Sequence, residues 1–423
     1  MIYINSIITR QTLHYGAIGL TLAALIYCTA SAPWVAMNGG HSAVTINGYT
    51  LEWEWMDVGQ SILFLEGNQQ YRARLSWPDM TLGLSDQNAA RMTPAVIISV
   101  LGGWTPTIWH ASIIATWLVW FITYLAMYRL LVLVCNRTTN ETAPSRTSKI
   151  FLAFLVCTSP GFLAFGGSID VHPFGYAGAA LGVLFYTWSL TEGYERTARN
   201  DTAHLRHILA LSTSLFLLDG TIQLGAPFSI FLLAVSCFLF IKNKNIFVFS
   251  VIIITIFLFI RFLWQLLAII GSRDIFVAHN DAISRLSLLF FAPQDFIHYL
   301  TEVQTTLLET YVDTYGYVLL LVFFLGWLRL SRFDQYSTTV WIILITLITV
   351  LLRPLPRTLY LTFPVIYTTA SNLWTFKFSP RSVPVMNRVM NSLGYIVMVA
   401  MATQRLGFLW GNLQTPAIWW SPN

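Results

Sequence analysis

Charged residues are scarce in this chain. Asp, Glu, Lys and Arg make up 10% of its 423 residues, while hydrophobic residues make up 56%. A soluble domain typically carries about 25% charged residues, so this chain has too few charges to cover a water-facing surface. Apolar runs such as residues 108–135 and 246–270 exceed the roughly 20 residues that a helix needs to cross a bilayer. We therefore predict an all-α polytopic membrane protein.

Cysteine is rare, and the common catalytic motifs are missing. The four cysteines form no CxxC pair, which removes the usual sequence basis for a metal site or a disulfide framework. No HExxH, P-loop, GxGxxG or GxSxG motif occurs, so nucleotide hydrolysis and serine-triad chemistry have no support. The net charge of +5 does not call for nucleic acid as a partner, because basic loops on the cytoplasmic side of a membrane account for it.

Hydropathy predicts about eleven membrane spans. They lie near residues 15–37, 108–135, 150–166, 174–191, 207–223, 225–241, 246–270, 315–331, 339–352, 358–374 and 389–411. The lysines (Lys149, Lys242, Lys244 and Lys377) fall on one predicted side together with arginines such as Arg137 and Arg332. The positive-inside rule assigns that side, and with it the N-terminus, to the cytoplasm. We interpret residues 1–423 as a single transmembrane domain.

Two long extracytoplasmic loops are predicted, at residues 38–107 and 271–314. Within the first, VTINGYTL places Asn47-Gly48 between β-prone residues, which predicts a small β-hairpin. In the second, the apolar spacing of Ile283, Leu286, Leu289 and Phe290 predicts a helix that lies in the membrane interface. Loops of this length usually carry function.

The predicted outer segments contain several arginines and no lysine. Arg72, Arg74 and Arg91 lie in the first outer loop. Arg353 and Arg357 are the first and last residues of the proline-stiffened run RPLPR. A guanidinium group stays charged and binds phosphate or carboxylate through two parallel hydrogen bonds, so these are candidate substrate-binding residues. Pairing with outer carboxylates or with lipid headgroups is the alternative explanation, and the residues alone leave both open.

Two carboxylates are candidate catalytic residues. Asp57 follows the run EWEW and precedes Gln60 and an apolar stretch, so it can face a lipid-borne substrate as a general base or a metal ligand. Asp170, in GGSIDVHPF, lies at the predicted membrane boundary of a separate loop. An N-terminal helix cap is the alternative role for Asp170.

Several runs resemble the C-type (GT-C) membrane glycosyltransferase superfamily. These are MDVGQSILFL, YRAR and ARMTPAVIISVLGG in the first loop, LVCTSPGFLAFGGSID around the third span, and RPLPRTLYLTFP late in the chain. The resemblance covers the layout of most of the chain. Val58 interrupts the Asp-Gly-Gln-like run that several bacterial members carry.

The resemblance implies a function and a role for each candidate residue. It implies transfer of a sugar from a polyprenyl-phosphate donor at the outer face of a bacterial inner membrane. Asp57 then takes the base position, Asp170 the second carboxylate, and Arg353 or Arg357 the phosphate contact. Gln60, Arg72, Arg74 and Arg91 complete the substrate-binding set. No metal is specified, although a divalent cation would suit the carboxylates. The alternative is a noncatalytic subunit of a larger membrane complex that keeps this fold and binds lipids and other membrane subunits.

Overall fold

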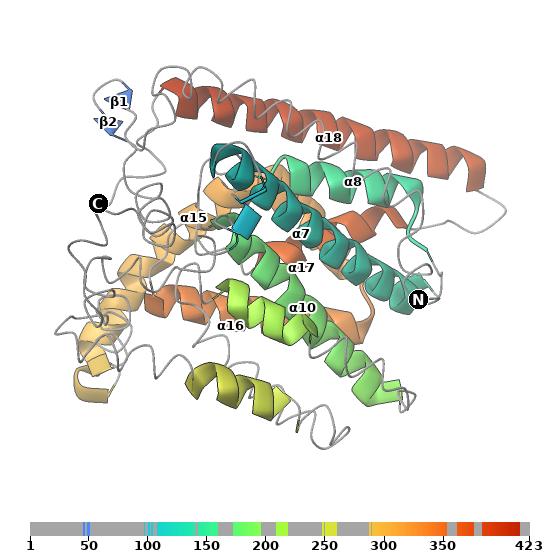
Figure 1. Ribbon diagram of the computed structural model, residues 1–423. Coiled ribbons are helices and arrows are strands. Elements are labelled where there is room, and N and C mark those ends of the chain that lie inside the picture. The colour runs from blue at the N-terminus through green and yellow to red at the C-terminus, as the bar shows by residue number, and fades with distance from the viewer. Residues whose placement is uncertain are drawn as a thin grey trace. The chain divides into compact units, whose positions relative to one another are not determined.

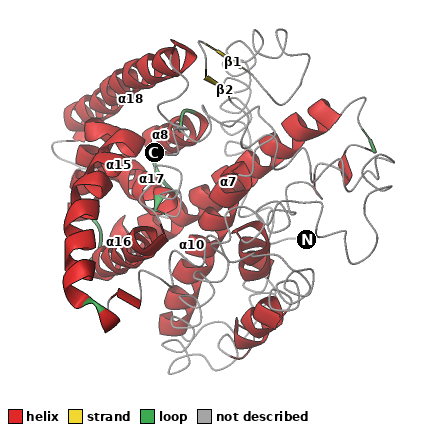
Figure 2. Cartoon of the chain, turned by 90° about the vertical axis from the view of Figure 1, so that its left-hand side faces the viewer, coloured by secondary structure: helices red, strands yellow, loops and turns green. Residues whose placement is uncertain are grey.

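The structure is a computed structural model of the whole chain (Figure 1). It describes residues 45–46, 49–50, 97, 100–101, 103–104, 108–139, 143–159, 172–195, 209–218, 248, 250–259, 287–288, 290–352, 362–375 and 383–414. Almost all of these residues are helical (Figure 2). The all-α class that the composition predicts is therefore confirmed for the described part of the chain.

Long helices make up most of the described residues. They are α7 (Ile108–Thr139), α8 (Arg146–Cys157), α10 (His172–Glu195), α15 (Pro293–Leu328), α16 (Arg332–Leu352), α17 (Phe363–Asn372) and α18 (Val383–Gln414), with the 3₁₀ turn η3 (Leu373–Thr375) after α17. Shorter helices cover Leu209–Leu218 and Ser250–Phe259. The strands β1 (Thr45–Ile46) and β2 (Tyr49–Thr50) pair antiparallel on either side of Asn47-Gly48, where the sequence predicts a hairpin.

The predicted membrane spans can be compared with these helices. Each predicted span that falls on described residues overlaps a helix, whereas spans 15–37 and 225–241 lie outside those residues. Among the described residues, two helical segments are long and apolar enough to cross a membrane, Trp117–Thr138 and Val385–Gln404. The other apolar segments, such as Phe174–Thr187 and Thr314–Leu328, are shorter. The number of spans therefore stays a prediction.

The chain divides into two compact units that alternate along the sequence. Unit 1 comprises Met1–Leu51, Trp120–Gly166 and Gln294–Asn423, and unit 2 comprises Glu52–Val119 and Gly167–Pro293. Within unit 2, α10 packs against the helix Leu209–Leu218, where the Ser214 hydroxyl donates a hydrogen bond of 2.6 Å to the carbonyl of Gly178. The single domain expected from the sequence is neither supported nor contradicted by this division.

The core of unit 1 forms around α17. Every residue of α17 is buried, including Phe363 and Tyr367, whose rings meet edge to face with centroids 5.4 Å apart. Pro364 suits the first turn of this helix, because that turn has no intrahelical acceptor for an amide there. α8 packs against α17 and η3, with the rings of Phe151 and Trp374 5.5 Å apart.

α15 is two helices joined at Gly316. This residue has φ 75° and ψ 151°, a left-handed conformation that glycine adopts without steric cost. The break falls at the predicted boundary between the outer loop 271–314 and the span 315–331. The helix before it begins at Pro293 and covers the rest of that loop. Of the interfacial helix expected around residues 283–290, residues 287–288 and 290 are described, and they are helical.

Gly326 allows the second half of α15 to approach α17 closely. A Cβ atom at this position would lie 2.3 Å from the carbonyl oxygen of Thr369 and 3.5 Å from the Cα of Ala370. Both neighbours belong to the backbone, so no side chain can rotate away to make room. The two helices therefore cross at a point where only glycine fits.

We expect Gly326→Ala to destabilise the protein by about 1–3 kcal/mol, the usual cost of overpacking a well-packed core. This loss exceeds the gain of about 1 kcal/mol that alanine brings to a helix interior. Thermal unfolding of the full chain in a neutral detergent measures it. Gly103→Ala is the control, since the nearest atom to its Cβ would be 3.7 Å away. An unchanged or raised melting temperature for Gly326→Ala would contradict the close crossing.

Candidate functional site

The predicted site residues lie outside the part of the chain that the structure describes. These are Asp57, Gln60, Arg72, Arg74, Arg91, Asp170, Arg353 and Arg357. Their roles stay predictions. The structure does describe the helix ends that flank three of them in sequence. α10 begins at His172, two residues after Asp170, and the end of α16 at Leu352 and the start of α17 at Phe363 bracket Arg353 and Arg357.

A cluster of tyrosines and threonines fixes the start of α17. The Tyr315 and Thr362 hydroxyls form a buried hydrogen bond of 2.8 Å. The Tyr315 ring also meets the Tyr367 ring edge to face, with centroids 6.2 Å apart. α15 thus holds both Thr362, the residue before α17, and the first turns of α17 itself. Arg357 precedes this anchored position by only five residues in sequence.

The same cluster ties α15 to α16. The Tyr311 and Thr346 hydroxyls hydrogen-bond at 2.8 Å, and the Tyr311 and Tyr315 rings lie 6.0 Å apart. Burial raises the pKa of the Tyr311 hydroxyl above its ordinary value of 10.0, although its hydrogen bond to Thr346 opposes the shift. Tyr311 is therefore neutral at physiological pH and acts as a hydrogen-bonding group.

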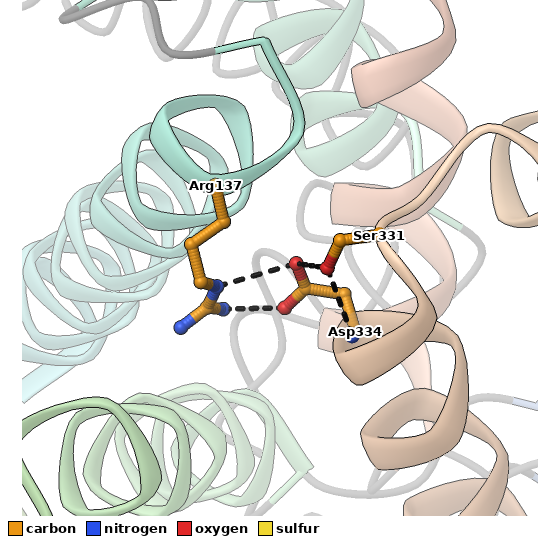
Figure 3. A network of polar contacts seen from close by, with 3 residues as sticks. All are labelled: Arg137, Ser331 and Asp334. Carbon is orange, nitrogen blue, oxygen red and sulfur yellow. Dashed lines mark hydrogen bonds and ion pairs between the residues drawn. The ribbon is translucent and has the colours of Figure 1, made fainter. Parts of the chain in front are cut away.

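A buried ion pair joins the end of α7 to the start of α16 (Figure 3). Arg137 Nη2 lies 2.6 Å from Asp334 Oδ1, and Arg137 Nε donates to Asp334 Oδ2 at 3.2 Å. The Asp334 side chain is 4% exposed and that of Arg137 19%. The guanidinium group also lies over the Phe333 ring, 5.6 Å from its centroid. This two-point contact is the strong geometry for an arginine–carboxylate pair.

Asp334 also belongs to the cap of α16. The Ser331 hydroxyl donates to Asp334 Oδ2 at 2.7 Å and accepts from the Asp334 amide at 3.2 Å. The Ser331 hydroxyl therefore caps the third residue of α16, and the run SRFD before an apolar stretch is a sequence signature of such a helix start. The pattern could have been found in the sequence, but nothing there identifies Arg137 as the partner, 197 residues away.

The turn between α15 and α16 is closed by one glutamine. Gln335 Nε2 donates to the carbonyls of Trp327 and Leu328 at 3.1 and 3.3 Å, satisfying acceptors that the end of α15 leaves free. Trp327 Nε1 donates in return to the Gln335 carbonyl at 3.3 Å. Together with Asp334, these contacts hold the ends of three helices in one arrangement. The network has the features of a structural clamp.

Metal ligands do not gather in the described residues. No group of three or more His, Cys, Asp or Glu side chains there could hold a metal ion. The comparisons with known proteins add no relative: no family model matches the chain, and no curated protein or solved structure is significantly similar to it.

We expect Asp334→Asn to destabilise the protein by about 1.5–3 kcal/mol, because the largely buried Arg137 guanidinium loses the carboxylate charge that faces it. Chemical unfolding of the full chain in a neutral detergent is the measurement. Arg332→Gln is the matched control, since Arg332 is exposed two residues away. Its effect should stay within about 0.5 kcal/mol.

A double-mutant cycle isolates the pair from the cap. Arg137→Gln combined with Asp334→Asn should cost less than the sum of the two single changes, with a coupling energy above about 1 kcal/mol. Additive losses would show that the two side chains act independently and would contradict the ion pair.

Proposed function

We propose that this protein is a multi-pass bacterial inner-membrane glycosyltransferase of the GT-C type. It uses a polyprenyl-phosphate-linked sugar as donor and acts at the outer face. With the cytoplasmic N-terminus and about eleven spans expected from the sequence, the charged loops lie on that face. Two long apolar helices and the overlap of helices with predicted spans are consistent with this architecture.

The proposed reaction needs a base and a cationic clamp. Asp57 takes the proton from an acceptor hydroxyl, whose oxygen attacks the anomeric carbon of the sugar. The bond from that carbon to the phosphate oxygen breaks, and polyprenyl phosphate leaves with the electron pair. Arg353 and Arg357 stabilise the negative charge that develops on the phosphate. A divalent cation held by Asp57 and Asp170 would assist the departure.

The anchored start of α17 is the observation that carries this proposal. Arg353 and Arg357 lie between the ends of two helices that Tyr311 and Tyr315 tie to α15. A phosphate-binding arginine that is held in place loses little entropy on binding, and such preorganisation would favour catalysis. A pair of arginines binds a phosphate or a carboxylate, and in the proposed reaction the anion is the phosphate leaving group.

A noncatalytic subunit of a membrane complex is the second candidate. α18 supports it, because only 17% of its candidate span is buried. Its exposed apolar side chains are Val385, Met386, Val389, Leu393, Tyr395, Ile396 and Val399. A helix with this much exposed apolar surface packs either against lipid or against another chain.

Binding of polyprenyl phosphate, the leaving group of the proposed reaction, tests the first candidate. We expect the purified full chain to bind it more tightly than the uncharged polyprenol, and Arg357→Gln to weaken binding about tenfold, which corresponds to about 1.4 kcal/mol. Asp57→Asn should keep the binding and lose sugar transfer from a polyprenyl-phosphate sugar. Arg332→Gln serves as the control for charge alone.

Equal affinity for polyprenyl phosphate and for polyprenol would contradict the transferase proposal. Copurification from native membranes in a mild detergent then tests the second candidate. A partner protein that copurifies in stoichiometric amount with the wild type, but not with Val389→Glu on α18, would identify the protein as a subunit of a complex.

A further inference from the structure

The two halves of α15 expose different kinds of side chain on either side of Gly316. The half after the break, residues 317–328, contains no charged residue. Its exposed side chains recur at the spacing of one helix face and are all aromatic or aliphatic: Tyr317, Leu321, Phe324, Leu325 and Leu328. Such a face suits contact with hydrocarbon, and a tyrosine at its start suits the boundary of the membrane.

The half before the break has one exposed side without charge. Ile297 and Leu308 are 63% and 68% exposed. Together with the exposed Thr301 and Gln304, they follow one another at intervals of four, three and four residues, which places them on one face of the helix. Leu300 borders this face and is also exposed. The Thr301 hydroxyl donates to the Ile297 carbonyl at 2.9 Å, so this donor needs no water as a partner.

Exposed ionisable side chains of this half lie on another side of the helix. They include Asp295, His298 and Glu309. His298 follows Asp295 by three residues and Glu309 follows it by fourteen, and both intervals return to nearly the same side of an α-helix. Because a helix turns by about 100° per residue, Asp295 lies almost opposite Ile297. Ionisable and apolar surface are thus separated on one helix.

This separation matches the boundary between water and hydrocarbon better than either phase alone. In hydrocarbon, the exposed carboxylates of Asp295 and Glu309 would be costly. In water, the exposed side chains of Ile297 and Leu308 would be costly instead. A helix that lies along the boundary satisfies both sides. Gly316 allows the chain to leave that plane, because its φ of 75° interrupts the helix directly before the uncharged half.

We propose that residues 293–315 of α15 lie along the interface of the outer leaflet, with Ile297, Leu300 and Leu308 against bilayer lipid, and that α15 enters the hydrocarbon at Gly316. No Lys or Arg occurs between Pro293 and Leu328, so attraction to anionic headgroups does not hold the helix there. Apolar contact with the acyl chains holds it, and a zwitterionic bilayer is therefore sufficient.

The interfacial position rests on the proposed multi-pass placement in the membrane and not on sugar transfer. It belongs to a helix that lies later in the chain than the interfacial helix expected from the sequence around residues 283–290. A reference residue in the second half of α15 keeps the two proposals separable in the experiment.

The test measures the depth of spin labels on the full chain in phosphatidylcholine vesicles. The native cysteines are replaced by alanine, and labels are attached to the single variants Ile297→Cys, Leu308→Cys, Asp295→Cys and Glu309→Cys. Collisions of each label with oxygen, which concentrates in lipid, are compared with its collisions with a water-soluble nickel chelate. We expect oxygen to dominate at residues 297 and 308, about 5–10 Å below the headgroups, and the chelate to dominate at residues 295 and 309. Residues 308 and 309 are adjacent, so each is the matched control for the other.

A label on Leu321→Cys, which is 59% exposed in the second half of α15, is the reference. Oxygen dominance at residue 321 together with chelate dominance at 297 and 308 overturns the interfacial position alone, because the second half would still lie in lipid. Chelate dominance at residue 321 as well overturns the membrane placement of α15 together with it.

Two further outcomes overturn the proposal. Exclusion of both reagents from residues 297 and 308 would show that protein covers this side of the helix. Oxygen dominance at residues 295 and 309 would place the whole segment in hydrocarbon. If Leu308→Cys does not fold, Leu300→Cys takes its place, and the same order of accessibilities is expected.

Discussion

The complete burial of α17 is the constraint on which the described part of unit 1 depends. A ten-residue helix is too short to be stable alone, so its conformation comes from its neighbours. α15 approaches it at Gly326 and holds its first residues through Tyr315, while α8 packs along it and against η3. Each of these helices contacts α17, which is buried on all sides. A substitution that displaces α17 at one contact therefore also disturbs its contacts with the other helices.

Polar side chains in this core divide into two groups with different consequences. The first group is fully paired, as in the clamp of Arg137, Ser331 and Asp334, and it specifies which helix ends meet. The second group has buried atoms with no hydrogen-bond partner among the described residues, such as Thr314 Oγ1, Asn372 Nδ2 and Trp374 Nε1. Paired groups add rigidity, whereas an unpaired buried group costs free energy. The first group therefore explains which helix ends meet, and the second lowers the stability of the same core.

The sequence predicts the helices well because long apolar runs leave few alternatives. Local sequence determines both kinds of agreement. Apolar runs predict the positions of α7, α10 and α18, and the turn signal Asn47-Gly48 predicts the pairing of β1 with β2. The sequence does not predict which helix ends meet. Arg137 and Asp334 are 197 residues apart, and only tertiary packing brings them into contact. Nor does hydropathy predict the helix that precedes Gly316, since its acidic residues resemble a loop. The predicted catalytic set rests on spacing and resemblance, and those residues lie outside the described part of the chain.

In the proposed membrane setting, the break at Gly316 has a consequence for the neighbouring lipid. The helical part after it, residues 317–328, has 12 residues and at 1.5 Å per residue is about 18 Å long. A bilayer core is about 30 Å thick, so this helix reaches across little more than half of it. A bilayer accommodates a short helix by becoming thinner beside it. In the proposed membrane setting, lipid headgroups next to α15 would therefore sit deeper than elsewhere, and a lipid-linked substrate arriving there would bring its phosphate closer to the anchored start of α17.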